Sequence, residues 1–316
     1  MKVAITDYTF ASLDIECQML EPLGAEVVSG QCKTPDDLIP LVREADAVIT
    51  QFAPVDADVI NAMEHAKVIV RYGIGVDNVD INVARQRGIP VCNVPDYCID
   101  EVADHTLALI LSATRSVVPN CLKVRSGEWG LAVPLEQMRA LRDCTVGIVG
   151  FGRIGREVIK RLQPFKCRCV VFDPMVDEEV VSAAGCEPMS LDSLLAAADI
   201  VTLHCPSTEA TRRLINQDAI RLMKQDAILV NVGRGDLVEL AALVGALQSG
   251  ALGGAVLDVF DPEPIPADSP ILQLDNVVSG SHVASASVPA AKKLRETAAR
   301  IAGLALKGEE LPNVVN

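Results

Sequence analysis

Short apolar runs rich in Val and Ile alternate along the chain with longer segments in which apolar residues recur at helical spacing. The short runs are almost continuously apolar, which is typical of strands buried on both faces. Strands that alternate with helices predict an α/β fold with parallel sheets covered by helices. The expected strands form two sets, residues 3–6, 26–29, 47–50, 68–71 and 90–93 in the first, and 145–149, 169–172, 200–204, 228–232, 255–259 and 277–279 in the second.

Two long helical patterns accompany these sets. The first runs from residue 99 to about residue 115, between the sets, and the second from about 289 to 306, ahead of an extended tail. This arrangement is expected when one domain is inserted into another and the chain then returns to the first. We therefore predict two doubly wound parallel-sheet domains, one formed by residues 1–98 plus 288–316 and the other by residues 99–287.

Length and charge narrow the class of protein. The chain has 316 residues. A single hydrophobic core rarely supports a chain of this length, which also favours two domains. Asp and Glu number 42 against 28 for Lys and Arg, so the net charge is −14. A surface this acidic repels phosphate backbones and anionic lipids, and we expect neither nucleic acid nor a membrane as partner. The absence of a signal-like segment or a membrane-spanning apolar stretch predicts a cytoplasmic protein.

Ten cysteines are scattered along the chain without a Cys-x-x-Cys pair, and several lie inside apolar runs. This distribution indicates buried, reduced thiols and not a disulfide framework. Cys167 and Cys169 are the closest pair, and we expect their side chains to point to opposite faces of a strand. No metal site is expected.

A glycine-rich segment, Gly150-Phe-Gly-Arg-Ile-Gly155, stands between an expected strand and an expected helix. There, Gly150 permits a tight turn, Gly152 lets the backbone approach a pyrophosphate, and Gly155 lets the helix pack on the strand. The N–H groups at the start of the helix favour an anion, and Arg153 adds positive charge. The motif predicts a Rossmann domain that binds a dinucleotide.

The next expected strand is followed by Asp173, at the distance where a dinucleotide fold places the acceptor for the ribose hydroxyls. Its carboxylate would repel a 2′-phosphate, and no Arg follows at positions 174 to 176, which favours NAD over NADP. The alternative is that Asp173 is only a turn residue.

Three polar residues stand just beyond the ends of later strands: Arg234, Glu263 and His282. Because ligands bind at the carboxyl edge of an open parallel sheet, we expect these side chains to converge on one cleft. A guanidinium can bind a carboxylate, an imidazole exchanges protons near neutral pH, and a carboxylate can orient the imidazole. Each residue also has a structural alternative. Arg234 could pair with Asp236, Glu263 could be a solvated loop residue, and His282 an ordinary loop histidine.

Further residues lie at the same strand ends or nearby. Cys205 follows His204 beside the expected cofactor site, and Asp258 stands where it could accept a hydrogen bond from a nicotinamide carboxamide. His65 is expected to be solvated. His105, on the expected helix at 99–115, is expected to pack or to line an interface.

The fourth strand of the first set ends in Arg71-Tyr-Gly-Ile-Gly75. Glycines on both sides of Ile74 leave backbone N–H groups accessible, which suits an anion, and Arg71 supplies positive charge on an acidic protein. Arg71 therefore suggests a substrate with a phosphorylated or otherwise anionic side chain. The alternative is a turn in which the glycines serve geometry alone.

Together these segments resemble the D-isomer-specific 2-hydroxyacid dehydrogenase family over nearly the whole chain. Ser281 departs from the family, since a Pro usually precedes the histidine, and Asp104 stands where Glu is frequent. Glu263 argues against the formate dehydrogenase branch, which has Gln there. The similar stretches are Tyr72-Gly-Ile-Gly-Val-Asp-Asn-Val-Asp80, the glycine motif with Asp173, Asn231-Val-Gly-Arg-Gly235, Leu257-Asp-Val-Phe-Asp-Pro-Glu-Pro264 and Ser281-His282.

The resemblance implies a role for each site residue and a Rossmann NAD domain inserted into a flavodoxin-like substrate domain. Arg234 would bind the carboxylate and carbonyl of the substrate, His282 would act as acid and base, and Glu263 as its partner. The backbone at Ile74 and Gly75 would contact the substrate carboxylate. Cofactor contacts are implied for Arg153, Ile154, Asp173, Cys205, Val232, Asp258 and His282.

Within the family, Arg71 and the Pro-Asn-Val-Val-Asn ending resemble phosphoglycerate dehydrogenases, whereas Val91-Cys-Asn-Val-Pro95 resembles the C-terminal-binding-protein corepressors. We therefore predict an NAD-dependent enzyme that transfers hydride between NAD(H) and a D-2-hydroxy acid or 2-oxo acid, with 3-phosphoglycerate as a candidate. The alternatives are a glyoxylate/hydroxypyruvate reductase and a corepressor-like protein that senses NAD(H) without catalysis. As in relatives, we expect a homodimer through the 99–115 helix and the segment up to Trp129.

Overall fold

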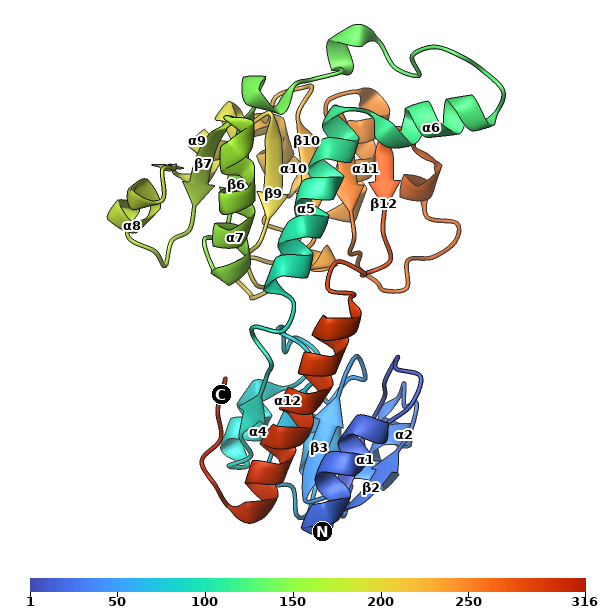
Figure 1. Cartoon of the computed structure of the whole chain (residues 1–316), viewed down its shortest axis with the longest axis vertical. Coiled ribbons are helices and arrows are strands. Elements are labelled where there is room, and N and C mark those ends of the chain that lie inside the picture. The colour runs from blue at the N-terminus through green and yellow to red at the C-terminus, as the bar shows by residue number, and fades with distance from the viewer. The chain divides into compact units, whose positions relative to one another are not determined.

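A computed structural model describes all 316 residues and divides the chain into two compact units (Figure 1). Unit 1 comprises Met1–Tyr97 and Ser287–Asn316, and unit 2 comprises Cys98–Ala286. Unit 2 is therefore an insertion into unit 1 in sequence. Each unit has one parallel sheet with helices on both faces, and the predicted α/β class with two doubly wound domains is confirmed.

The sheet of unit 1 has five strands in the order β2-β1-β3-β4-β5, and every neighbouring pair is parallel. This is the flavodoxin-like order 2-1-3-4-5. Side chains of β1 enter the cores on both faces, as the continuous apolar run predicts. The strands are β1 (Lys2–Ile5), β2 (Glu26–Ser29), β3 (Ala47–Thr50), β4 (Ile69–Arg71) and β5 (Val91–Cys92).

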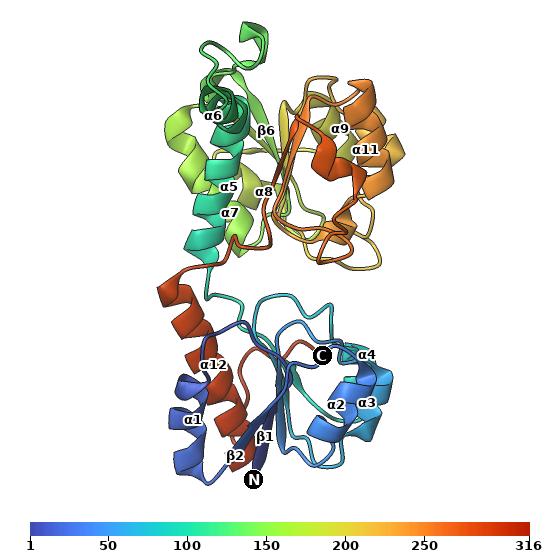
Figure 2. The same cartoon turned by 90° about the vertical axis from the view of Figure 1, so that its right-hand side faces the viewer.

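Helices cover both faces of this sheet (Figure 2). One face packs against α1 (Asp14–Leu20) and the long C-terminal helix α12 (Val288–Lys307). The other face is covered by α2 (Pro35–Val42), α3 (Ala57–Ala62) and α4 (Ile81–Gln86).

A buried carboxylate ties α1 to α12 and to the end of β4. Glu16 is fully buried and accepts hydrogen bonds from Arg295 at 2.8 and 2.6 Å and from the hydroxyl of Tyr72 at 2.9 Å. A buried charge is tolerated when it is paired and fully hydrogen-bonded, as here. Because Tyr72 follows Arg71 directly, this network also fixes the start of the glycine-containing turn at residues 73–75.

The sheet of unit 2 has seven parallel strands in the order β12-β11-β10-β9-β6-β7-β8. Counted from β6, this is the Rossmann order 3-2-1-4-5-6 with one further strand at the β12 edge. The sequence pattern missed β8, because two residues, one of them Pro, are too short a run to show apolar patterning. The strands are β6 (Thr145–Val149), β7 (Arg168–Phe172), β8 (Glu187–Pro188), β9 (Ile200–Leu203), β10 (Ile228–Asn231), β11 (Gly254–Leu257) and β12 (Val277–Ser279).

Helices α5 and α7 pack on one face of this sheet, and α9 to α11 on the other (Figure 2). Arg161 of α7 joins the first pair by ion pairs to Asp100 and Asp104 of α5. No single helix is long and apolar enough to cross a membrane; α5 and α6 reach that length and composition only as a pair bent by 63°. The helices are α5 (Ile99–Thr114), α6 (Val117–Arg125), α7 (Arg153–Leu162), α8 (Glu178–Ala183), α9 (Leu191–Ala197), α10 (Gln217–Leu222) and α11 (Leu240–Ser249).

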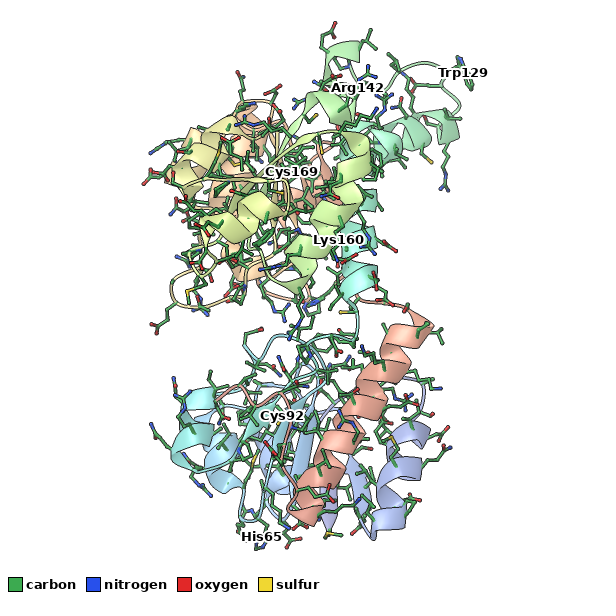
Figure 3. All side chains as sticks on the ribbon, turned by 60° about the vertical axis from the view of Figure 1, so that its left-hand side comes forward. His65, Cys92, Trp129, Arg142, Lys160 and Cys169 are labelled. Atoms are coloured by element: carbon green, nitrogen blue, oxygen red, sulfur yellow. The ribbon has the colours of Figure 1, made fainter.

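The expected orientation of one cysteine pair is wrong. Cys169 lies in β7 (Figure 3), and its sulfur is 4.0 Å from the sulfur of Cys167, so the two side chains share a face. The reason is the strand repeat itself, since residues i and i+2 point to the same side and only adjacent residues point to opposite sides. All ten cysteines are present as thiols.

Candidate active site

The glycine motif forms the turn between β6 and α7. Gly150 has a φ of +100°, a left-handed conformation that glycine adopts without strain. A Cβ on Gly150 would lie 2.7 Å from the backbone of Cys205. One on Gly155 would lie 2.2 Å from the carbonyl oxygen of Gly150. Both positions require glycine. Gly150 lets the turn lie against the end of β9, and Gly155 lets α7 pack on the turn.

The start of α7 suits the phosphates of a dinucleotide. A Cβ on Gly152, the N-cap, would meet no atom within 4 Å, so the space in front of the backbone is open. No side chain caps the helix, and Arg153 and Ile154 follow as its first residues, with Arg153 exposed. Open backbone, uncapped N–H groups and a positive helix end are the features that hold a pyrophosphate.

Asp173 lies beside this turn, directly after β7. Its Oδ2 accepts a 2.7 Å hydrogen bond from the N–H of Phe151, and its Oδ1 accepts one of 2.9 Å from the N–H of Met175. Asp173 therefore has the bonds of a turn residue and also stands where a dinucleotide fold binds the ribose. The two interpretations are compatible, because a carboxylate has about four acceptor sites.

Arg234 lies in the loop after β10, and a buried asparagine shapes this loop. The side chain of Asn231 accepts from the N–H of Gly233 at 3.0 Å and donates to the carbonyl oxygen of Arg234 at 2.7 Å. Nη1 of Arg234 donates to the carbonyl oxygen of Gly233 at 2.8 Å. These bonds fix the backbone from which the guanidinium extends.

The next residue brings this loop against the loop that carries Glu263. A Cβ on Gly235 would lie 1.9 Å from the carbonyl carbon of Phe260, so only glycine permits the approach. The charge of Arg234 acts on the carboxylate of Glu263 as a result. The two loops follow neighbouring strands, β10 and β11.

Asp236, the alternative ion-pair partner of Arg234, has contacts of its own. Its Oδ2 accepts a 2.6 Å hydrogen bond from the hydroxyl of Ser207 and lies 3.3 Å from Nε of Arg212. Asp236 thus holds the segment between β9 and α10.

Glu263 and His282 contact each other, although they are 19 positions apart. Nδ1 of His282 lies 2.8 Å from Oε2 of Glu263, and Oε1 of Glu263 accepts a 2.9 Å hydrogen bond from the N–H of Phe260. Both side chains are about one third exposed, at 28% for the histidine and 33% for the glutamate. The structure therefore brings Arg234, Glu263 and His282 together at the carboxyl edge of the unit 2 sheet.

Competing effects act on the Glu263 carboxyl group. Burial favours its neutral form and raises its pKa. The hydrogen bond and charge of His282, the N–H of Phe260 and the charge of Arg234 outweigh burial, and the pKa of Glu263 is lowered. Glu263 is therefore a carboxylate at neutral pH, able to orient the ring and to stabilise an imidazolium.

The backbone of His282 has an unusual conformation, with a φ of +58°. Asp258 holds it there. The carbonyl oxygen of Asp258 accepts from the N–H of His282 at 2.7 Å, and the carboxylate accepts from Val283 at 3.1 Å and Ala284 at 2.8 Å. A non-glycine residue in this region persists only where its surroundings enforce it, and Asp258 supplies three such bonds.

These contacts of Asp258 differ from the expected one to a nicotinamide carboxamide. Its side chain has no exposed surface, and His105 of α5 lies 3.8 Å from its Oδ1. In this conformation Asp258 acts on the site through the loop that it holds. His105 is half-buried, and His65 is exposed.

Cys205 and Val232 complete the strand ends next to the glycine turn. Burial raises the pKa of Cys205 to about 11, so its thiol stays protonated at neutral pH. Val232 is 8% exposed and follows Asn231 directly. Burial also lowers the pKa of neighbouring His204 to about 4, and its Nε2 lies 2.9 Å from the hydroxyl of Thr202. His204 is neutral at pH 7 and packs against its own strand.

The remaining predicted site residues belong to unit 1. Arg71 is buried at the end of β4, and its guanidinium carbon lies 5.9 Å from the ring centre of Phe52. Ile74 and Gly75 are partly exposed, and the carbonyl oxygen of Ile74 accepts a 2.7 Å hydrogen bond from Asn93. The turn at 73–75 is thus anchored on both sides, by Asn93 and by the buried Tyr72.

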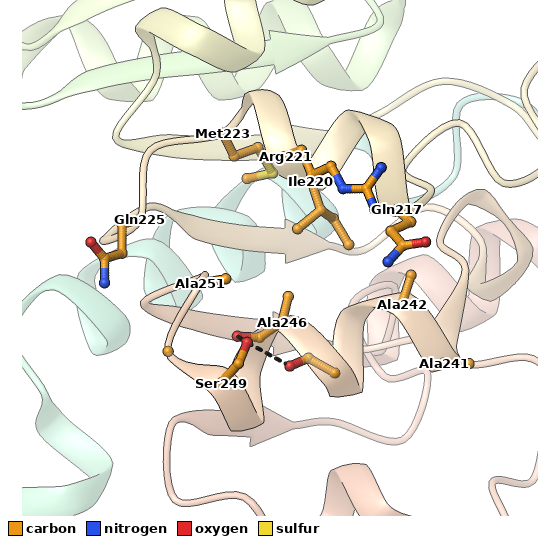
Figure 4. Close-up of a pocket in the computed structure, with 12 residues that line it drawn as sticks. Gln217, Ile220, Arg221, Met223, Gln225, Ala241, Ala242, Ala246, Ser249 and Ala251 are labelled. Carbon is orange, nitrogen blue, oxygen red and sulfur yellow. Dashed lines mark hydrogen bonds between the residues drawn. The ribbon is translucent and has the colours of Figure 1, made fainter.

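A separate hollow of about 760 Å³ lies between α10 and α11 on the surface of unit 2 (Figure 4). Alanines and glycines line much of it, and Arg221 pairs with Asp218 at 2.7 Å. None of the predicted site residues lines this hollow.

Sequence reasoning missed Asn231, and it gave Asp258 a different contact. Asn231 is 1% exposed inside an apolar strand, and a buried amide at a strand end is the signal that could have identified it. The bonds of Asp258 to Val283 and Ala284 span 25 and 26 positions, so no local pattern reveals them.

A sequence model described as the NAD-binding domain of D-isomer specific 2-hydroxyacid dehydrogenases matches residues 107–284. Among curated relatives, a glyoxylate reductase of Korarchaeum cryptofilum is 39% identical over 282 residues, which cover 88% of this chain and 85% of that protein. A D-3-phosphoglycerate dehydrogenase of Methanocaldococcus jannaschii is 37% identical over 306 residues, 95% of this chain. The chain spans only 57% of that relative.

Solved structures of 2-hydroxyacid dehydrogenases are also similar to this chain. The D-lactate dehydrogenase of Aquifex aeolicus, in complex with NAD and lactic acid, matches with a TM-score of 0.87 and 27% identity. The match covers 97% of this chain and 96% of that chain.

Proposed function

We propose specific roles for the site residues of this chain. The chain belongs to the D-isomer-specific 2-hydroxyacid dehydrogenase family, and it is an NAD-dependent oxidoreductase acting on small 2-hydroxy or 2-oxo acids. Arg234 binds the carboxylate and carbonyl of the substrate. His282 exchanges the proton at the C2 oxygen, and Glu263 orients the ring and stabilises its cation. The observation that carries this proposal is the 2.8 Å contact between His282 and Glu263 next to the Arg234 loop.

The chemistry divides between the chain and its cofactor. When bound, the nicotinamide supplies or accepts the hydride at C2. In reduction, His282 donates a proton to the carbonyl oxygen from Nε2, because Nδ1 is engaged by Glu263. Arg234 holds the carboxylate so that C2 is positioned, and its charge polarises the carbonyl. In oxidation, His282 takes the hydroxyl proton.

The two units divide the binding. Residues 99–287 form the NAD-binding domain, with Gly150, Gly152 and Gly155 at the phosphates and Asp173 at the ribose. Residues 1–98 plus 288–316 form the substrate domain, in which the N–H groups at Ile74 and Gly75 bind the carboxylate. The open backbone at Gly152 supports the first assignment, and the anchored turn at 73–75 the second.

The cofactor preference should depend on Asp173. We expect Asp173→Ala to raise the KM for NADH by about 10-fold or more, since hydrogen bonds to a charged acceptor contribute about 1.5–3 kcal/mol. The KM for NADPH should fall, because the charge that repels the 2′-phosphate is gone. Steady-state kinetics with both cofactors measures the change, with Asp177→Ala as control for a nearby exposed carboxylate. An unchanged ratio of NADH to NADPH efficiency in a folded variant would contradict the role of Asp173.

Two substrate classes remain, and a specific observation favours each. Buried Arg71 next to the 73–75 turn favours a 2-hydroxy acid with an anionic side chain, such as 3-phosphoglycerate. The match to the glyoxylate reductase of Korarchaeum cryptofilum covers 85% of that protein, and this favours glyoxylate or hydroxypyruvate instead. We propose 3-phosphoglycerate first, because it uses the one buried arginine at the substrate turn, and glyoxylate/hydroxypyruvate reduction second.

A panel of 2-oxo acids tests the proposed function. NADH oxidation is followed with 3-phosphohydroxypyruvate, hydroxypyruvate, glyoxylate and pyruvate, and the chirality of each product is determined. We expect saturable turnover with at least one acid, at a KM between about 1 μM and 1 mM, and a D-2-hydroxy acid as product. No turnover with any of them, while NADH still binds, would overturn the proposed function.

Arg71→Ala separates the two substrate classes within the same assay. If the phosphorylated acid is the substrate, this variant raises the KM for 3-phosphohydroxypyruvate by about 10-fold or more, since a charged hydrogen bond is lost. The KM for glyoxylate, which has no side chain to bind, should change less than twofold. An equal effect on both acids would remove Arg71 from the specificity argument.

We further propose a cytoplasmic homodimer. Helix α6 and the loop behind it extend from the rest of unit 2 and carry exposed apolar side chains (Figures 1 and 3). Trp129 is 91% exposed and Leu135 is 69% exposed. Apolar side chains this exposed on one segment are typical of a surface that a second copy covers.

A further inference from the structure

Three cysteines meet at the outer edge of the unit 2 sheet, away from the proposed active site. Cys167 directly precedes β7, Cys169 lies within it, and Cys186 directly precedes β8. The sulfurs of Cys167 and Cys169 are 4.0 Å apart. Asp173 follows the opposite end of β7, so these thiols lie at the amino edge of the sheet and take no part in the proposed reaction.

The third cysteine is a neighbour because of the strand register. Strands β7 and β8 pair in parallel with Val170 opposite Glu187 and Val171 opposite Pro188. One position earlier on each strand stand Cys169 and Cys186. Neighbouring strands lie about 4.7–4.9 Å apart, which falls within the Cα separation of about 4.4–6.8 Å that a disulfide accepts. Cys169 therefore has two neighbouring thiols, Cys167 along its own strand and Cys186 on the adjacent strand.

The electrostatics of the cluster distinguish the three sulfurs. A hydrogen bond with the Cys169 thiol lowers the pKa of Cys167, against the opposing effect of burial. The same hydrogen bond raises the pKa of Cys169, so Cys167 is the member of this pair that carries the thiolate. Cys167 is also the more accessible, being partly exposed where Cys169 and Cys186 are buried. Reactive cysteines combine a stabilised thiolate with access, and Cys167 has both.

We propose that Cys167, Cys169 and Cys186 form a redox site that a hydroperoxide oxidises to a disulfide containing Cys169. The Cys167 thiolate attacks the outer oxygen of the hydroperoxide, the O–O bond breaks, and an alcohol or water leaves with one proton. The sulfenic acid on Cys167 then reacts with the Cys169 thiol, the S–S bond forms and water leaves. Two thiols lose two electrons and two protons, and one hydroperoxide is reduced.

The geometry allows a second product. Sulfurs 4.0 Å apart must approach to about 2.05 Å, which requires side-chain rotation at Cys167 and Cys169. Cys186 can then attack the Cys169 sulfur and release Cys167 by thiol–disulfide exchange. The exchanged bridge would join β7 to β8 and would lie between residues that already face each other.

Peptide mapping of the whole protein tests the proposal. The protein is treated with excess hydrogen peroxide, alkylated and digested with trypsin, which cuts after Lys166, Arg168 and Arg212. Cys167 leaves in the dipeptide 167–168, whereas Cys169, Cys186 and Cys205 stay in one peptide, 169–212. A first-formed bridge adds the dipeptide to that peptide. An exchanged bridge leaves the dipeptide alkylated, and the long peptide then has an internal disulfide and a single alkyl group, which fragmentation should locate on Cys205. Either result supports the proposal, and dithiothreitol should restore all ten alkylated cysteines.

Variants decide whether Cys169 is the centre of the site. Cys169→Ser should lose both products while its dehydrogenase activity stays within twofold of wild type, because the thiol is outside the proposed active site. Cys167→Ser and Cys186→Ser test the two partners separately if Cys169→Ser folds poorly. Cys121→Ser is the control, since Cys121 is exposed and lies in helix α6, outside the cluster. No disulfide after peroxide, or disulfides that lack Cys169, would overturn the proposal.

Discussion

Replacing His282 with alanine should lower kcat for 2-oxo acid reduction by about 100- to 10,000-fold, the usual contribution of a positioned general acid. The Kd for NADH should stay within threefold of wild type, because the glycine turn and Asp173 do not depend on the ring. Stopped-flow reduction and NADH fluorescence titration measure the two quantities separately. His65→Ala is the matched control, since it removes an exposed imidazole from unit 1. Full activity of the His282 variant would exclude the proposed acid.

The partner of His282 makes the same hypothesis testable by pH. Glu263 is ionised at neutral pH because its pKa is lowered, and its negative charge favours the imidazolium. Reduction needs the protonated acid, so activity is present at low pH and is lost as the pH rises. Glu263→Gln removes the charge that favours the imidazolium, so the pH at which kcat falls should move down. A mere packing defect would lower kcat at every pH without moving the profile.

The fold was predictable because parallel strands buried on both faces leave strong apolar runs. The runs at 145–149 and 277–279 coincide with β6 and β12. The misses have two different causes. Strand β8 is two residues long, and only its pairing with β7 identifies it. The relation of Cys167 to Cys169 follows from the strand repeat, which the sequence interpretation applied wrongly.

Only part of the candidate site could be predicted from the sequence. Charged and imidazole side chains directly after strands are visible in a sequence, and this is why the proximity of Arg234, Glu263 and His282 could be predicted. The residues that hold them have no such signal. Asp258 was expected at the cofactor, yet its bonds go to the backbone after His282, 25 and 26 positions away. Long-range bonds of this kind appear only when the sheet brings β11 and β12 together.

The second large effect is expected at Arg234. Arg234→Ala should lower kcat/KM for a 2-oxo acid by about 30- to 5,000-fold, because truncating one side of a hydrogen-bonded charge pair costs about 2–5 kcal/mol. Arg234→Lys should recover only part of this, since an ammonium group cannot form the two parallel bonds that a guanidinium makes to a carboxylate. Steady-state kinetics with NADH and the best acid of the panel measures both variants. Arg221→Ala, which removes an exposed arginine of α10, is the matched control.

A neutral substrate analogue distinguishes carboxylate binding from a structural role of Arg234. Wild type should prefer a 2-oxo acid to the corresponding 2-oxo amide, because the amide has no charge for the guanidinium to bind. If Arg234 provides that preference, the ratio of the two kcat/KM values should fall toward one in Arg234→Ala. If the substitution only disturbs the loop held by Asn231 and Gly235, both substrates lose activity equally and the ratio persists. That second outcome would move carboxylate recognition to the turn at residues 73–75, leaving His282 and Glu263 as the unit 2 contribution to the reaction.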